Sequence, residues 1–149
     1  MNKVLMLSVM VILSLFAVRA TFAKPSECPQ PRKHTTKAKG GLAKKDHNSA
    51  EYKRADAKKG KLIYTETAKP MVCKQCHGSK GDGGGMSGDL KPAPRNFTCA
   101  ETMKDISAGQ MFHIIKNGSK GTSMVAHGRT LKDKEIWDVV KYIRSTWVK

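Results

Sequence analysis

The pentapeptide CKQCH, from Cys73 to His77, holds the residues of this chain that are best suited to chemistry. A Cys-x-x-Cys pair can bind zinc, exchange a disulfide or attach a haem covalently. A structural zinc site usually takes a second pair of Cys or His at a matching spacing, and this sequence holds no such pair. Thioredoxin-like exchange uses a motif that opens a helix after a strand, whereas Pro70 interrupts the short segment before Cys73. The sequence therefore disfavours both zinc and disulfide exchange.

The spacing within the motif fits a covalently bound haem. On one helical turn, Cys73 and Cys76 stand three residues apart, so both sulfur atoms face one side and each can form a thioether with a haem vinyl group. His77 follows on the same face, where its imidazole can reach the iron as an axial ligand. The motif predicts one haem c, attached through Cys73 and Cys76, with His77 on the iron.

A second axial ligand would come from a Met or His further along the chain. Met111 falls on the apolar stripe of an expected helix, which favours ordinary core packing. Met124 lies in a polar loop between two expected helices, where its side chain can cross to the far side of a haem, and its neighbours KGTS offer it no apolar stripe to join. These features favour Met124 among the candidates for the second ligand. The other candidates are Met86, Met103, His113 and His127.

The elements that must position these residues are helices. Residues 55–68 are helix-compatible, residues 107–118 begin at a Ser suited to N-capping and end at a Gly, and residues 131–147 carry the strongest apolar stripe. Between them lie Gly- and Pro-rich loops without a strand pattern. We expect an all-α domain of three to four helices over residues 55–149, wrapped around one covalently bound haem. A domain with such a small, loop-rich core usually needs a disulfide, a metal or a cofactor to be stable.

The first 54 residues differ in character from the rest. Residues 1–23 combine an early Lys, an apolar run too short to span a bilayer comfortably, and the small residues Thr21 and Ala23, which is typical of a cleavable secretory signal peptide. Residues 24–54 are basic and contain one large aliphatic residue, Leu42, so we expect a disordered tail. The chain is therefore expected to be periplasmic or otherwise exported.

The formal net charge of the chain is +16. Residues 24–55 hold nine Lys or Arg and three Asp or Glu, and residues 56–149 hold seventeen and nine, so both parts are basic. A basic surface attracts acidic protein surfaces, anionic lipid headgroups or nucleic acid, or only keeps a protein soluble. Export makes nucleic acid the least fitting of these partners. We expect redox partner proteins with an acidic docking surface, with contact to a membrane surface as an open alternative.

Two further cysteines, Cys28 and Cys99, would meet an oxidising compartment after export. A disulfide between them is one outcome, and it would fasten the tail to the domain. In the other, Cys99 is a small buried residue, while Cys28 stays reduced or pairs between chains. Sequence alone does not decide the connectivity.

Residues 56–149 resemble the class I, single-haem c-type cytochromes. The resemblance lies in Gly60 and Tyr64, in the haem motif with the Gly that follows it, in PRNF at residues 94–97, in residues 111–118, in Met124 and in the terminal LKDKEIWDVVKYIR. It implies that Met124 is the distal ligand of the haem iron. It also implies that the first and last helices cross, with Gly60 and Tyr64 meeting Val139 and Tyr142. Val125 stands where many members have Pro.

The resemblance implies a carrier of single electrons rather than an enzyme. With His77 and Met124 both on the iron, no position would be open to a substrate. Two alternatives stay open: a subunit that passes electrons within a larger oxidoreductase complex, and a haem protein whose distal ligand is displaced by a small gas or peroxide.

Overall fold

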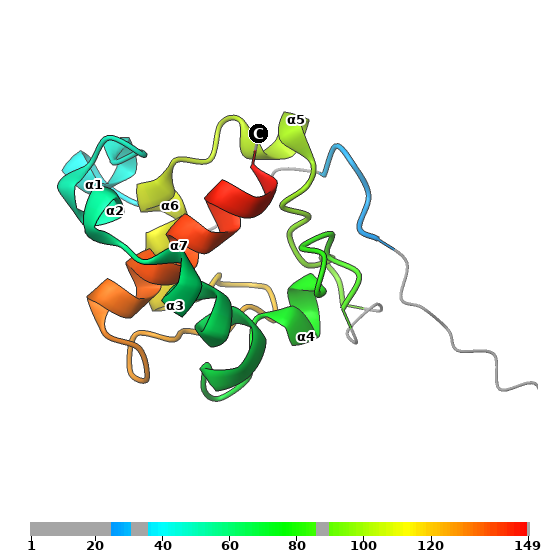
Figure 1. Cartoon of the computed structure of the whole chain (residues 1–149). Helices are drawn as coiled ribbons and strands as arrows, with labels where there is room; N and C mark the ends of the chain where they lie inside the picture. The colour runs from blue at the N-terminus through cyan, green and yellow to red at the C-terminus, as the bar shows by residue number, and fades with distance from the viewer. Residues whose placement is uncertain (1–24, 31–35, 86–89, 149) are drawn as a thin grey trace, which may run out of the picture.

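The computed structural model describes residues 25–30, 36–85 and 90–148 (Figure 1). Among these residues it contains helices and loops and no strand, so the expected all-α fold is confirmed. The helices, in chain order, are α1 (Gly40–Lys44), α2 (Ala50–Arg54), α3 (Ala57–Leu62), the π-helical turn η1 (Ile63–Thr67), α4 (Lys74–His77), α5 (Ala100–Met103), α6 (Ala108–Asn117) and α7 (Asp133–Trp147).

The C-terminal helix α7 lies at the centre of the helix packing. It contacts α2, α3, η1 and α6. Its start is fixed by Glu135, whose carboxylate accepts a hydrogen bond from the backbone amide of Lys132 at 2.7 Å. Its buried stripe is the one that the sequence predicts, and it includes Ile136, Val139, Val140 and Ile143.

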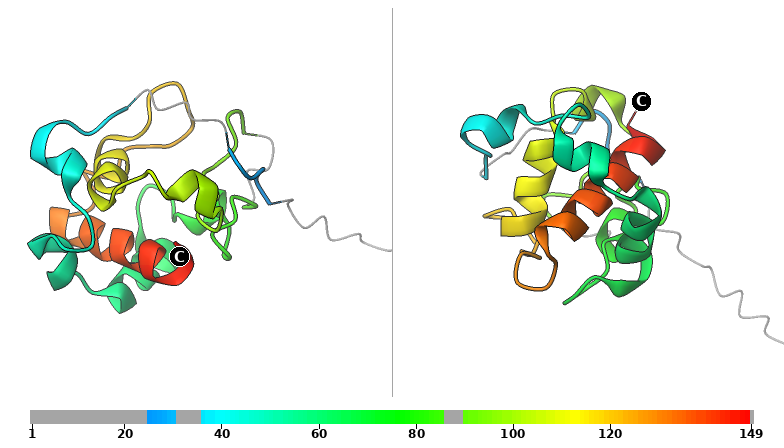
Figure 2. Two further views of the ribbon diagram at one scale, coloured as in Figure 1. Left: turned by 90° about the horizontal axis from the view of Figure 1, so that it is seen from above. Right: turned by 60° about the vertical axis from the view of Figure 1, so that its left-hand side comes forward.

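Helices α3 and α7 cross at a glycine (Figures 1 and 2). A Cβ atom on Gly60 would lie 2.0 Å from the backbone oxygen of Asp138, so only glycine lets the two backbones approach this closely. One turn later, Tyr64 is fully buried, and its ring meets that of Tyr142 edge-on at 5.5 Å. The expected crossing is confirmed for Gly60, Tyr64 and Tyr142, and the backbone that meets Gly60 belongs to Asp138.

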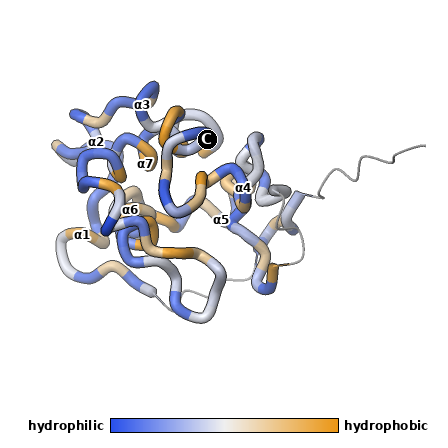
Figure 3. Tube along the Cα trace, turned by 90° about the horizontal axis from the view of Figure 1, so that it is seen from below, coloured by the Kyte–Doolittle hydropathy of each residue, from blue (hydrophilic) through white to orange (hydrophobic). Residues whose placement is uncertain are grey.

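Helix α6 packs on another side of α7. Its N-cap is the expected one, because the Ser107 hydroxyl accepts a hydrogen bond from the Gln110 amide at 3.0 Å. It ends at Gly118, whose φ of 73° is the left-handed conformation that glycine adopts readily. Phe112 of α6 stacks on Trp137 of α7 at 4.7 Å. The hydropathy-coloured trace shows hydrophobic residues alternating with hydrophilic ones along α6 and α7, whereas α2 and α3 are mainly hydrophilic (Figure 3).

Residues 36–54 form α1 and α2, which pack on α6 and α7. The expectation of a disordered tail is therefore wrong for these residues. They have almost no apolar surface of their own, but the domain supplies polar partners for their backbone. The carbonyl of Lys45 accepts from the Gly109 amide at 2.9 Å, and that of Ala43 accepts from the Ser107 hydroxyl at 2.7 Å. Leu42 packs against the hydrophobic core.

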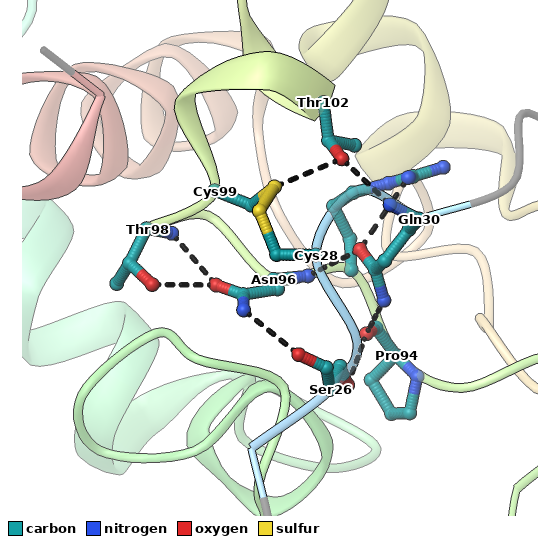
Figure 4. The surroundings of a disulfide bond; sticks show 9 residues. Ser26, Cys28, Gln30, Pro94, Asn96, Thr98, Cys99 and Thr102 are labelled. Carbon is teal, nitrogen blue, oxygen red and sulfur yellow. Dashed lines mark hydrogen bonds between the residues drawn. A yellow bond between two sulfur atoms is a disulfide. The ribbon is translucent and has the colours of Figure 1, made fainter.

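Residues 25–30, here called the strap, lie across the loop before α5 and are joined to it by a disulfide (Figure 4). Cys28 and Cys99 are bonded, with their Cα atoms 5.7 Å apart. Of the two outcomes left open by the sequence, the structure has the intramolecular disulfide. The expected signal peptide, residues 1–23, lies outside the described residues. In the part of the chain that is described, no helix is both long enough and apolar enough to cross a membrane.

Candidate haem-binding site

A cavity of about 400 Å³ lies between α4, α6, α7 and the loops that join them. Cys73, Cys76 and His77 line it, and so does Met124 from a loop 47 residues further along the chain. The structure thus brings all the predicted site residues to one cavity. Most of the other lining side chains are apolar, among them Phe97, Met103, Ile106, Ile115, Val139 and Ile143.

The haem motif forms the short helix α4, as the spacing of its cysteines predicts. The amide of His77 donates to the carbonyl of Cys73 at 2.9 Å, which closes one helical turn and puts three motif side chains on the cavity. Gly78 ends the turn with a φ of 78°. The hydroxyl of the buried Tyr64 then donates to the Gly78 carbonyl at 2.7 Å and so fixes the end of the motif against the α3–α7 crossing.

His77 is held with one ring nitrogen occupied. Its Nδ1 lies 3.0 Å from the backbone oxygen of Arg95, and because a carbonyl can only accept, Nδ1 carries the proton. Burial lowers the pKa of His77, which keeps the ring neutral. The ring also stacks on Phe97 at 4.6 Å. The remaining nitrogen, Nε2, therefore keeps its lone pair for a metal, the arrangement that metal-binding histidines usually have.

The thiol of Cys73 is in an apolar setting. Burial raises its pKa to about 12, so the side chain is a neutral thiol rather than a reactive thiolate. Catalytic Cys-x-x-Cys pairs have the opposite shift, because their attacking sulfur is activated by a lowered pKa. Among the described residues, no three side chains of His, Cys, Asp or Glu are grouped to hold a metal ion. The setting of Cys73 therefore fits thioether attachment of a haem.

Met124 is half-buried and packs against the hydrophobic core from the loop between α6 and α7. Its loop is closed by hydrogen bonds at both ends of the residue. The Met124 amide donates to the Thr122 hydroxyl at 3.1 Å, and the Ser119 amide donates to the Met124 carbonyl at 3.0 Å. These contacts hold Met124 at the cavity wall, in the loop that follows the end of α6 at Asn117.

The other candidate ligands, apart from His127, divide into three groups. Met103 and Met111 line the cavity as buried parts of α5 and α6. His113 does not line the cavity, and its ring contacts Asn117 at the surface. Met86 lies outside the described residues.

His127 differs from what its sequence context suggests. A histidine in a polar loop would be expected at the surface, but His127 is only 3% exposed and lines the cavity. Its Nδ1 donates to the carbonyl of Lys69 at 2.8 Å, so a partly buried hydrogen bond to the segment before the haem motif explains its position. His127 is thus the second candidate for an axial ligand after Met124.

Sequence reasoning missed the strap as part of this site. Glu27 and Gln30 line the cavity, although they precede the haem motif by more than 40 residues. No periodicity or motif marks them. The paired cysteines Cys28 and Cys99 were the one available signal that the strap reaches the domain.

The comparisons with known proteins identify the family of the chain. The cytochrome c family profile matches residues 57–147. Among solved structures, a chain of the Kuenenia stuttgartiensis reducing HAO-like protein complex Kustc0457/Kustc0458 is 28% identical, with a TM-score of 0.52 over 62% of this chain and 44% of that chain. This chain therefore spans less than half the length of that relative.

Two further solved structures are single c-type cytochromes. The KustC0563 c-type cytochrome is 24% identical, with a TM-score of 0.49 over 60% of this chain and 98% of that one. The c-type cytochrome SorU from Sinorhizobium meliloti is 22% identical, with a TM-score of 0.46 over 62% and 92%. No curated protein sequence matches. Because the family profile covers more than half of the chain, the chain belongs to the cytochrome c family.

Proposed function

We propose that this chain carries single electrons on one haem c, which Cys73 and Cys76 bind covalently and His77 and Met124 ligate. The observation that carries this proposal is the convergence of these side chains on one apolar cavity, with the Nδ1 of His77 already occupied by the Arg95 carbonyl. We also propose the chain organisation that goes with it: a signal peptide over residues 1–23 and a haem domain over residues 55–149.

The chain's own residues would set how the haem behaves. Haem c supplies a reversible one-electron couple when bound. The apolar lining excludes water, and the hydrogen bond from His77 to Arg95 holds the ring in a fixed orientation. A methionine as the second ligand favours a higher reduction potential than a second histidine. If Met124 takes that place, no position is open to a substrate, and the chain acts as a carrier rather than as a catalyst.

The visible spectrum of the purified haem-loaded protein tests the ligand assignment. We expect a weak band towards the red end of the spectrum in the oxidised form, which reports a methionine sulfur on the iron. A spectrum without this band would favour His127 as the second ligand or an open position. An open position would support the alternative function, reaction with a small gas or peroxide.

A basic surface with an apolar centre would receive the redox partner. Met71 lines the cavity and is 38% exposed, so it lies at the cavity mouth. Lys74 and Lys80 are exposed on either side of the motif histidine in sequence. Acidic groups around the partner's own redox centre would complement this surface, mainly by raising the association rate.

A second candidate function is that of a subunit in a larger oxidoreductase complex. One relative, 28% identical, belongs to a protein complex. Purification of the native protein at low salt distinguishes the two functions. A carrier would elute at the size of a single chain, whereas a subunit would elute with its complex.

Export to an oxidising compartment is part of the proposal. The disulfide between Cys28 and Cys99 is the kind of bond that persists outside the cytoplasm and is rare within it. Cell fractionation of the native source, with the haem protein found outside the cytoplasmic fraction, would support this localisation.

A further inference from the structure

The strap lies against the loop that contains Pro94 and Asn96 (Figure 4), and the Arg95 carbonyl between them accepts from His77. We infer that Gln30 is a positioning residue for His77, and that it acts through the backbone of Arg95. This inference rests on the proposed role of His77 as an iron ligand. It concerns residues that precede the part of the chain matched by the family profile, which begins at residue 57.

Gln30 binds the backbone on both sides of Arg95. Its Oε1 accepts from the Asn96 amide at 2.8 Å, and its Nε2 donates to the Pro94 carbonyl at 2.9 Å. The same Oε1 also lies 3.4 Å from Nη1 of Arg95. One side-chain amide therefore fastens residues 94–96, and the carbonyl in the middle of this segment is the one that accepts from His77.

Gln30 is itself held firmly. It is only 9% exposed, and its backbone amide donates to the Thr102 hydroxyl at 2.9 Å. Two residues earlier, Cys28 is bonded to Cys99. At the other end of the strap, the Ser26 hydroxyl donates to the Pro94 carbonyl at 2.9 Å, and the Ser26 carbonyl accepts from the Asn96 side chain at 3.0 Å. The strap is thus fixed at Gln30 itself and at two residues that precede it, Ser26 and Cys28.

The consequence for the iron follows from the hydrogen bond of the ligand. A partner that accepts from the ring N–H of a ligating histidine raises the basicity of the ring and fixes its orientation. A more basic ligand stabilises the ferric form relative to the ferrous form. If Gln30 is lost, the Arg95 carbonyl becomes freer to move and the hydrogen bond from His77 weakens. The reduction potential should then rise.

The chain offers a matched control in Gln110 of α6. Its side chain makes the same pair of backbone hydrogen bonds, accepting from the Ala38 amide at 2.8 Å and donating to the Thr36 carbonyl at 2.9 Å. Gln110 does not line the cavity. Gln30→Leu and Gln110→Leu therefore each remove two hydrogen bonds between the N-terminal segment and the rest of the domain. Only the pair made by Gln30 holds the loop whose carbonyl accepts from His77.

The experiment compares haem-loaded wild type, Gln30→Leu and Gln110→Leu. Two quantities are measured: the reduction potential, and the rate at which the His77 Nδ1–H exchanges with deuterium in the ferrous protein, followed by ¹⁵N NMR. For Gln30→Leu we expect faster exchange and a ferrous-to-ferric ratio that is higher at a fixed ambient potential, by up to about tenfold, which corresponds to about 59 mV for one electron. For Gln110→Leu we expect wild-type values of both.

A second variant covers a failure of Gln30→Leu to fold. Gln30→Glu keeps the side-chain size and the acceptor for the Asn96 amide, but it turns a carboxylate oxygen towards the Pro94 carbonyl, so we expect faster exchange here too. Exchange at the wild-type rate in either folded Gln30 variant, or an equal change in Gln110→Leu, would overturn the inference and leave the proposed function standing. A wild-type protein that binds no haem would overturn both.

Discussion

Gly60 of α3 lies directly against the backbone oxygen of Asp138 in α7. A Cβ atom on Gly60 would be 2.0 Å from this oxygen and 2.9 Å from the Cβ of Tyr142. The oxygen belongs to the backbone of the most central helix and cannot move aside as a flexible side chain could. Helices α3 and α7 can therefore meet only at a residue without a side chain, and η1, which follows α3, brings Tyr64 to Tyr142.

Replacing this glycine should separate the two helices. For Gly60→Ala we expect a loss of about 2 kcal/mol or more in the free energy of unfolding, because overpacking outweighs the gain of about 1 kcal/mol that alanine brings to a helix. Gly41→Ala in α1 is the control, since a Cβ there meets nothing within 4 Å. Chemical denaturation of both variants measures the difference, and equal stabilities would contradict the close crossing.

The disulfide should contribute strongly to stability. It joins residues 71 positions apart, and in the chain-entropy model closing a loop of this length stabilises the fold by about 4 kcal/mol. We expect the double variant Cys28→Ser with Cys99→Ser to lose a large part of this in denaturant titrations. Thiol counting on the unfolded, unreduced wild type should find neither Cys28 nor Cys99 reactive. Two reactive thiols from this pair would contradict the bond.

Met124 should control access to the iron. In Met124→Ala we expect a lower reduction potential and a ferrous protein that binds carbon monoxide, because the softer of the two proposed ligands is gone. Met86→Ala should change neither property. His127→Ala should leave the iron closed and lower the stability instead, since a buried ring and its hydrogen bond to Lys69 are removed. If His127→Ala opens the iron and Met124→Ala does not, the ligand assignment moves to His127.

Charge near the motif should steer small redox reagents as it would steer a partner. For Lys74→Glu with Lys80→Glu we expect oxidation of the ferrous protein by hexacyanoferrate(III) to slow about tenfold at low ionic strength, and the difference to shrink as salt screens it. Lys39→Glu with Lys44→Glu is the control, because it makes the same change in net charge at α1, and α1 and α4 lie on opposite sides of the molecule (Figures 1 and 3). Stopped-flow kinetics measure the rates. If the control slows the reaction equally, the net charge of the protein sets the rate and the position of Lys74 and Lys80 does not.

Much of the fold and site could be predicted because the relevant signals are local. The N-cap at Ser107, the apolar stripe of α7 and the haem motif each occupy a few neighbouring residues. The polar loop around Met124 and the apolar stripe that holds Met111 are also visible in the sequence, and both residues line the cavity. These features depend on capping, periodicity and helical spacing, which a single sequence displays directly.

What could not be predicted depends on contacts between distant segments. Segment 40–45, which contains α1, makes backbone hydrogen bonds to Ser107 and Gly109, more than 60 residues away, and Leu42 is its one large aliphatic residue that packs on the core. His127 is buried because its ring nitrogen finds the Lys69 carbonyl. Gln30 acts on the loop before α5 through a single amide. Such polar pairings leave no periodic pattern in the sequence.

A spectroelectrochemical titration of the purified protein, with carbon monoxide added to the ferrous form, tests the central claim most directly. We predict one covalently bound haem per chain, a single reversible one-electron transition, and no spectral change with carbon monoxide, because His77 and Met124 fill both axial positions. A protein without haem would contradict the claim that the cavity holds one. A ferrous haem that binds carbon monoxide at once would contradict the claim that this chain is a pure electron carrier.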